Sequence, residues 1–111
     1  MTKAYDLTDL QELSGGSQEF VVEIITVFLN ETPVNLENLE RFCATGNFEK
    51  VEFLAHKMKS SFGLLGMATA HRIASQMEQA GKNLSKEGLV EMMAELKEVA
   101  TTGMDAVKAE L

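Results

Sequence analysis

Apolar residues recur every three or four positions along most of the chain, and proline, which would interrupt such a pattern, occurs only once. This spacing places apolar side chains along one face of an α-helix, and no long stretch alternates as a strand does. The short interruptions contain glycine, asparagine, serine or threonine, which begin or end helices. The sequence therefore predicts a chain of amphipathic helices joined by short turns.

The turn residues divide this pattern into one short helix and four longer segments. Leu7, Leu10 and Leu13 predict the short helix, which stops at the Ser-Gly-Gly turn of residues 14–16. The longer segments are predicted over residues 17–45 as one helix bent at Pro33, and over residues 47–66, 69–81 and 85 onward. Their expected caps are Ser17, Asn47, Gly66, Thr69, Gly81 and Ser85, with a hydrophobic staple between Leu84 and Leu89.

Four amphipathic segments with short links favour antiparallel neighbours. The predicted fold is therefore all-α: an antiparallel up-down-up-down four-helix bundle, with the short N-terminal helix packed against it. The 111 residues suit a single domain, residues 1–111. Such a bundle closes its own core, so we expect a monomer.

Composition excludes several classes of protein. The net charge of −7 disfavours nucleic-acid binding, which needs a basic surface. No apolar run is long enough for a membrane span or a signal peptide. Cys43 has no partner for an internal disulfide, which fits a cytoplasmic location. The charge is uneven, however: residues 50–82 hold five bases and two acids, and could attract an anionic group or an acidic partner.

His56 lies within this basic stretch and away from the predicted core. On a helical wheel of about 100° per residue, it falls about 140° from the centre of the apolar stripe of residues 48–65. Lys59, Ser60 and Gly63 follow it by three, four and seven residues and share its face. The sequence therefore predicts a solvent-facing histidine with a cation one turn away and little bulk above it.

This pattern suits phosphoryl transfer. A neutral imidazole nitrogen is a nucleophile, and Lys59 can stabilise the charge on the equatorial oxygens of a phosphoryl group in transfer. Ser60 and Gly63 leave room for a second protein. Phe53 and Leu64 fall off the core stripe toward the histidine, and with Lys57 they predict a docking patch with an apolar centre and a charged surround.

These residues resemble the signature of the histidine-containing phosphotransfer (HPt) domain family: a histidine, a lysine three residues later, two small residues, then glycines seven and ten residues after the histidine. Here these are His56, Lys59, Ser60, Ser61, Gly63 and Gly66. Ser60 stands where many members have glycine, but it is still small. The resemblance covers nearly the whole chain, including "LTDLQELSGGSQEFVVEIITVFLNETP" and "ERFCATGNFEKVEFLAHKMKSS".

The resemblance implies a four-helix bundle that carries phosphoryl groups between aspartates of response-regulator receiver domains in a two-component phosphorelay. His56 would be the phosphoacceptor and Lys59 its charge partner. Receiver domains, and a hybrid sensor histidine kinase, would be the partners. No phosphate-binding loop is present, so we expect a phosphocarrier and not an ATP-dependent kinase. We expect no cofactor on this chain, with Mg²⁺ held by the receiver.

Other interpretations stay open. The chain could bind a receiver without transferring a phosphoryl group, or His56 could be a surface histidine without a role. A third interpretation, the dimerisation and phosphoacceptor helix pair of a sensor kinase, is disfavoured. That module usually has an acid just after the histidine and a proline five residues on, where this chain has Lys57 and Ser61, and the chain has more helices than the module needs. His71 is interpreted as structural or as a surface residue, because no ligand spacing supports a metal site.

Overall fold

A single helix of 28 residues, α2, dominates the computed structural model, which describes residues 4–111. Serine at the N-cap and a left-handed glycine after its last residue bound this helix. The helices are α1 (Thr8–Leu13), α2 (Gln18–Thr45), α3 (Phe48–Leu64), α4 (Ala68–Lys82) and α5 (Leu89–Val107), followed by a 3₁₀ turn at Lys108–Glu110. The described residues contain no strand, so the predicted all-α class is confirmed.

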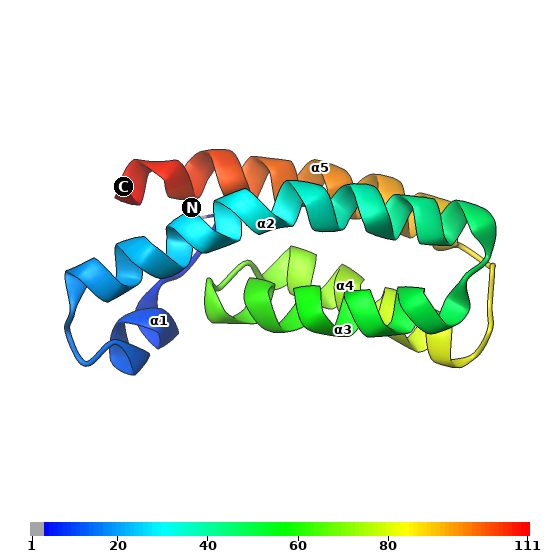
Figure 1. The fold of residues 1–111 in the computed structure, drawn as a ribbon, viewed down its shortest axis with the longest axis horizontal. Helices are drawn as coiled ribbons and strands as arrows, with labels where there is room; N and C mark the ends of the chain where they lie inside the picture. The colour runs from blue at the N-terminus through cyan, green and yellow to red at the C-terminus, as the bar shows by residue number, and fades with distance from the viewer. Residues whose placement is uncertain (1–3) are drawn as a thin grey trace.

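The four long helices form two layers. Figure 1 shows α2 beside α5 in one layer and α3 beside α4 in the other. Followed by colour, the chain runs along the long axis in α2, returns in α3, runs forward in α4 and returns in α5. The short α1 lies below the start of α2, where Leu10 enters the core with no exposed surface.

The buried apolar side chains of all five helices form one continuous core. Phe28 of α2 and Phe62 of α3 meet there edge to face, with ring centroids 6.0 Å apart. Aromatic pairs favour this geometry because the positive ring edge meets the negative ring face. The core fixes which side of α3 faces inward, and therefore which side faces water.

Two predicted N-caps, and the predicted single helix that contains Pro33, agree with the structure. The side chains of Ser17 and Asn47 accept hydrogen bonds from the backbone N–H groups of Phe20 and Lys50, three residues on. Pro33 lies inside the continuous α2 and is exposed. The prediction of one helix through this proline is therefore confirmed.

The boundaries of α4 and α5 differ from the prediction. Met67 is the N-cap of α4, and Thr69 already lies inside that helix. Gly81 is also inside α4 and is buried, so it does not end the helix. Ser85 accepts a hydrogen bond from the N–H of Glu87 in the following turn, and α5 begins only after Gly88, whose φ is +71°.

The predicted staple is wrong as well. Leu84 is 70% exposed, so it cannot pack against the buried Leu89. Its φ of +54° places it in the left-handed region, which is unfavourable for a side chain with a Cβ.

The N-terminal segment is attached to the bundle at two points. The backbone N–H of Asp6 donates to the carbonyl of Leu65 at 3.0 Å, above the α3–α4 turn. The Tyr5 hydroxyl donates to the Glu110 carboxylate at 2.6 Å. No helix in the described part of the chain is both long and apolar enough to cross a membrane.

Candidate functional site

His56 projects from the outer face of α3. Its neighbours in sequence on the inner face, Ala55 and Met58, are buried in the core. The His56 side chain is 62% exposed, so a second protein can reach the imidazole. The helical wheel predicted this orientation, and the structure agrees with it.

A buried carboxylate from α4 binds both predicted catalytic side chains. Oε2 of Glu78 lies 2.9 Å from Nδ1 of His56, and Oε1 lies 2.6 Å from Nζ of Lys59. The Glu78 side chain is only 8% exposed, whereas that of Lys59 is 25% exposed. The site is therefore a triad of His56, Glu78 and Lys59, with only the imidazole largely in water.

Close packing of α3 against α4 places this carboxylate. Gly81 lies three residues after Glu78, where the two helices approach closely. A Cβ added to Gly81 would lie 2.8 Å from the backbone N of Glu52 and 2.9 Å from the carbonyl oxygen of Phe48. Real Cβ atoms do not approach backbone atoms this closely, so only glycine fits here. The short separation brings Glu78 within hydrogen-bonding distance of α3.

The environment of Glu78 keeps its carboxyl ionised. The hydrogen bond from Lys59 lowers the pKa of the Glu78 carboxyl most. Burial opposes this effect, and the hydrogen bond with His56 lowers the pKa further, so that it lies below its ordinary value. An ionised carboxylate only accepts hydrogen bonds, so Nδ1 of His56 must carry the proton. The lone pair of the imidazole is then on Nε2, which has no hydrogen-bond partner among residues 4–111.

Glu78 was missing from the sequence prediction of this site. A signal was present, because Glu78 follows Ala74 by four residues and Met77 by one, and both are buried in the core. An acid on the core side of a helix needs a partner of opposite charge. The sequence did not show that this partner is Lys59, nineteen residues away on another helix.

The five predicted docking residues are not equivalent in the structure. Phe53 is 73% exposed, and Lys57 and Ser60 are exposed as well. The Ser60 hydroxyl donates to the carbonyl of His56 at 3.3 Å. Leu64, in contrast, is partly buried and packs against the core, so it offers less surface than predicted.

The two signature glycines have different surroundings. A Cβ on Gly63 would lie 3.1 Å from Cδ2 of His71 on α4, so the exposed His71 ring lies where a larger side chain would project. Gly66 has a φ of +64°, and a Cβ there would collide with the backbone of Asp6. Gly66 therefore ends α3, as predicted, and also admits the N-terminal segment.

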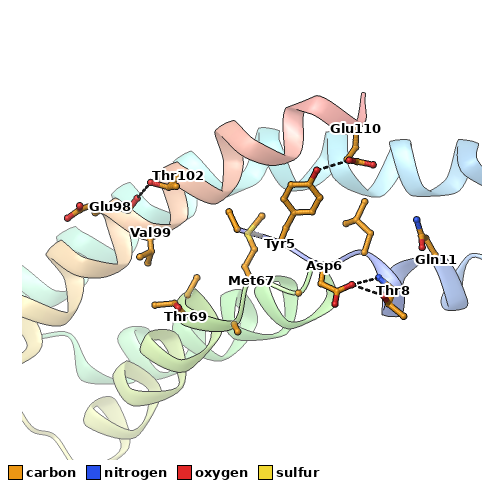
Figure 2. Close-up of a pocket in the computed structure, with 15 residues that line it drawn as sticks. Tyr5, Asp6, Thr8, Gln11, Met67, Thr69, Glu98, Val99, Thr102 and Glu110 are labelled. Carbon is orange, nitrogen blue, oxygen red and sulfur yellow. Dashed lines mark hydrogen bonds between the residues drawn. The ribbon is translucent and has the colours of Figure 1, made fainter. Parts of the chain in front are cut away.

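A separate cavity lies away from this site. It has a volume of about 760 Å³, and the N-terminal segment, the α3–α4 turn and the end of α5 surround it (Figure 2). Tyr5, Met67 and Val99 are among its lining residues, but the residues of the triad are not. No group of three or more possible metal ligands occurs within residues 4–111.

Comparison with known proteins gives one match. The family model of the Hpt domain matches residues 23–110, from the first third of α2 to the final 3₁₀ turn. The match includes the whole of α3 and α4, and with them the triad. Neither a curated protein nor a solved structure matches the chain.

Proposed function

Because this chain belongs to the Hpt domain family, whose members transfer phosphoryl groups in two-component signalling, we propose that it accepts a phosphoryl group from a receiver-domain aspartate on His56 and passes it to another receiver domain. The observation that carries this proposal is the exposed imidazole whose Nδ1 is bound to the buried Glu78 carboxylate at 2.9 Å. This contact selects the tautomer with a nucleophilic nitrogen facing water.

Transfer begins when the Nε2 lone pair of His56 attacks the phosphorus of an aspartyl phosphate. The Nε2–P bond forms, the P–O bond to the aspartate breaks, and the carboxylate leaves with the bonding electrons. The ring keeps its Nδ1 proton and becomes positively charged. The Glu78 carboxylate lies directly against that proton, so it stabilises the charge that develops on the ring. The reverse sequence returns the phosphoryl group to a second receiver.

Lys59 is the proposed partner of the phosphoryl oxygens. Phosphoryl transfer depends mainly on positioning and on stabilising charge on these oxygens. The ammonium group of Lys59 is one helical turn from His56 and shares a carboxylate with it. This arrangement supports a role in which Lys59 binds the oxygens of the group transferred to His56.

The receiver is proposed to dock on the outer face of α3. Phe53 supplies exposed apolar area, and Lys57 supplies positive charge in the basic region of residues 50–82. Ser60 and Gly63 are small, so they leave space for a partner beside His56. Leu64 contributes the part of its side chain that is not buried. Such a face suits an acidic partner. The receiver is expected to bring the aspartate and its Mg²⁺, so this chain needs no cofactor or ATP site of its own.

A second function is compatible with the same face. Phe53 is 73% exposed beside the imidazole, and a docking module without transfer would use this surface equally well. Binding and transfer differ in their dependence on His56. A binding module would keep its affinity and its function without the imidazole, whereas a phosphocarrier would lose its chemistry.

The partners follow from the proposed reaction. We expect receiver domains of response regulators and of a hybrid sensor histidine kinase, and a monomeric, cytoplasmic protein. A gel-filtration experiment coupled to light scattering would give one chain per particle at micromolar concentration. A stable dimer would contradict the monomer but not the transfer reaction.

The test uses purified chain and a panel of receiver domains, each phosphorylated by acetyl phosphate in the presence of Mg²⁺. Wild-type protein should acquire label that acid removes and alkali preserves, as expected for a phosphorus–nitrogen bond. His56→Gln should acquire no label, whereas His71→Gln, the matched control on α4, should be labelled normally. Label on His56→Gln would overturn the proposal. Receiver binding and function that survive in this variant, without label on the wild type, would favour the binding module.

A further inference from the structure

The Glu78 carboxylate has a second lysine close to it. Nζ of Lys82 lies 3.8 Å from Oε2 of Glu78, one turn along the same helix. Nζ of Lys59 lies much closer to the carboxylate, at 2.6 Å from Oε1. Lys82 is 47% exposed and Lys59 is 25% exposed, so Lys82 is the freer of the two side chains. In this structure Lys59 neutralises the carboxylate, and Lys82 lies just beyond hydrogen-bonding distance.

Phosphorylation of His56 would place two demands on Lys59. The phosphoryl oxygens need a cation, because a phosphoryl group carries roughly two negative charges near neutral pH. Glu78 also needs a cation, because a buried carboxylate left without its partner strongly destabilises the fold. The ammonium of Lys59 is already at 2.6 Å from the carboxylate, so turning to the phosphoryl group weakens its contact with Glu78.

Lys82 can meet the second demand with a small movement. A charge-assisted hydrogen bond from an ammonium group to a carboxylate is about 2.8 Å long, roughly 1 Å shorter than the observed separation. The flexible side chain of Lys82 needs only a change of rotamer to shorten the separation by this amount. The carboxylate oxygen paired with Lys82 at this longer distance is Oε2, which also binds Nδ1 of His56, whereas Lys59 donates a hydrogen bond to Oε1.

We propose, on the basis of the function above, that Lys82 is a positioning residue that replaces Lys59 on Glu78 when His56 is phosphorylated. As the Nε2–P bond forms and the P–O bond of the donor breaks, Lys59 turns to the phosphoryl oxygens and Lys82 closes onto the carboxylate. Glu78 thereby stays ionised and stays bound to the Nδ1 proton. Lys82 does not touch the transferred group.

The proposal predicts an asymmetry between the two states of the protein. Lys82→Gln should leave the unphosphorylated triad unchanged, because Lys59 already neutralises Glu78 there. The same substitution should lower the phosphorylated fraction at equilibrium with a receiver about two- to fivefold, the effect of losing one partly exposed ion pair. Lys82→Arg keeps the charge and should restore the wild-type equilibrium.

Two measurements test this asymmetry. The first is the equilibrium level of phosphorylated His56 with a receiver that labels the wild type, for Lys82→Gln, Lys82→Arg and Lys108→Gln. Lys108 is the matched control because it forms an ion pair with the nearby Asp105, 3.3 Å away, at the end of the chain. The second is NMR of the His56 ring nitrogens and of the lysine Cε signals, before and after phosphorylation with phosphoramidate.

The expected result is that the Lys59 and Lys82 signals move on phosphorylation while those of Lys108 do not, and that only Lys82→Gln lowers the equilibrium level. Unaltered equilibrium in Lys82→Gln would overturn the role of Lys82 while transfer through His56 stands. The proposal would also be overturned if Lys82→Gln changed the NMR signals of the His56 ring nitrogens as much in the unphosphorylated protein as in the phosphorylated one. Lys82 would then be a partner of Glu78 in both states. Failure to label wild-type His56 with any receiver would instead reject the proposed function.

Discussion

Glu78 organises the site because it combines burial with two strong hydrogen bonds. Its carboxylate is 8% exposed and binds His56 and Lys59 at 2.9 Å and 2.6 Å. Each contact depends on the other, because the lysine keeps the carboxylate ionised and the ionised carboxylate keeps the proton on Nδ1. The proton on Nδ1 of His56 is therefore held by a residue of α4, although His56 and Lys59 both lie on α3.

Removing the Glu78 side chain tests this dependence. Glu78→Ala should lower the rate of phosphotransfer about ten- to a hundredfold, as is typical when the group that orients a functional histidine is lost. Gln79→Ala is the matched control, because Gln79 is the exposed neighbour on α4. Stopped-flow or gel-based transfer assays with one receiver measure the rate, and ¹⁵N shifts of His56 report the tautomer. Equal rates and equal tautomers in Glu78→Ala and wild type would contradict the assignment.

The same carboxylate makes stability depend on pH. The pKa of Glu78 is lower in the folded protein than its ordinary value, so its ionised form is favoured by folding. This contribution is complete above the unfolded-state pKa and is lost as the pH falls through the folded-state pKa. Glu78→Gln should therefore be less stable than wild type by about 1–3 kcal/mol at pH 7.

Urea denaturation from pH 7 down to pH 3 measures this difference. The free energies of unfolding of wild type and Glu78→Gln should converge as the pH falls below the ordinary value of the glutamate, about 4.5. His56 and Lys59 from α3 and Lys82 from α4 are the charged or titratable partners of the carboxylate, so they must be unchanged in both proteins. A constant difference across the whole range would show that the charge of Glu78 does not contribute.

At the scale of helices, the close approach of α3 and α4 positions the triad. Gly81 permits this approach because a Cβ there would meet the backbone of Phe48 and Glu52, which cannot move aside easily. At Gly63 the obstacle is only the ring of His71, a side chain that can rotate. The same substitution should therefore have different effects at these two positions.

Gly81→Ala and Gly63→Ala form a matched pair for this argument. Gly81→Ala should destabilise the fold by about 2–3 kcal/mol, because overpacking against backbone forces the helices apart. Gly63→Ala should change the free energy of unfolding by less than about 1 kcal/mol, because the helix propensity of alanine offsets the displacement of His71. Thermal or urea denaturation measures both. Equal destabilisation of the two variants would contradict the close approach at Gly81.

Helix boundaries were predictable where one local hydrogen bond decides them. Ser17 and Asn47 cap α2 and α3 through backbone N–H groups three residues ahead. Ser85 has the same chemistry but bonds Glu87 only two residues on, so it forms a turn before the start of α5. A residue type alone does not distinguish these local geometries.

Features that depend on two helices were not predictable from one sequence. Gly81 was predicted to end a helix because glycine is common at helix ends. Its actual role, the close contact with the backbone of α3, is visible only in three dimensions. Glu78 was missed for the same reason, since Lys59 and His56 are distant in sequence. The exposure of His56 on α3 was predictable because it follows from a local, periodic pattern of apolar residues.

At the scale of the whole molecule, one hydrogen bond connects the two ends of the described chain. The Tyr5 hydroxyl and the Glu110 carboxylate are 105 residues apart in sequence and 2.6 Å apart in space (Figure 2). Asp6, the next residue, is bound to the α3–α4 turn through Leu65. The N-terminal segment therefore ties the end of α5 to the end of α3, and we expect its loss to weaken the whole bundle.

The pKa of Tyr5 is raised mainly by its hydrogen bond to Glu110, with burial as the next cause. Because the neutral phenol is favoured in the folded state, its contribution is complete below the unfolded-state pKa and is lost as the pH rises through the folded-state pKa. Tyr5→Phe should lower the free energy of unfolding by about 1–2 kcal/mol at pH 7, and the difference from wild type should shrink above about pH 10.

A double-mutant cycle with Glu110→Gln, measured by urea denaturation at both pH values, isolates this contact. Additive effects of the two substitutions would show that the ends are not coupled through this hydrogen bond, whereas a coupling energy that fades at alkaline pH would show that it joins the N-terminal segment to the end of the described chain.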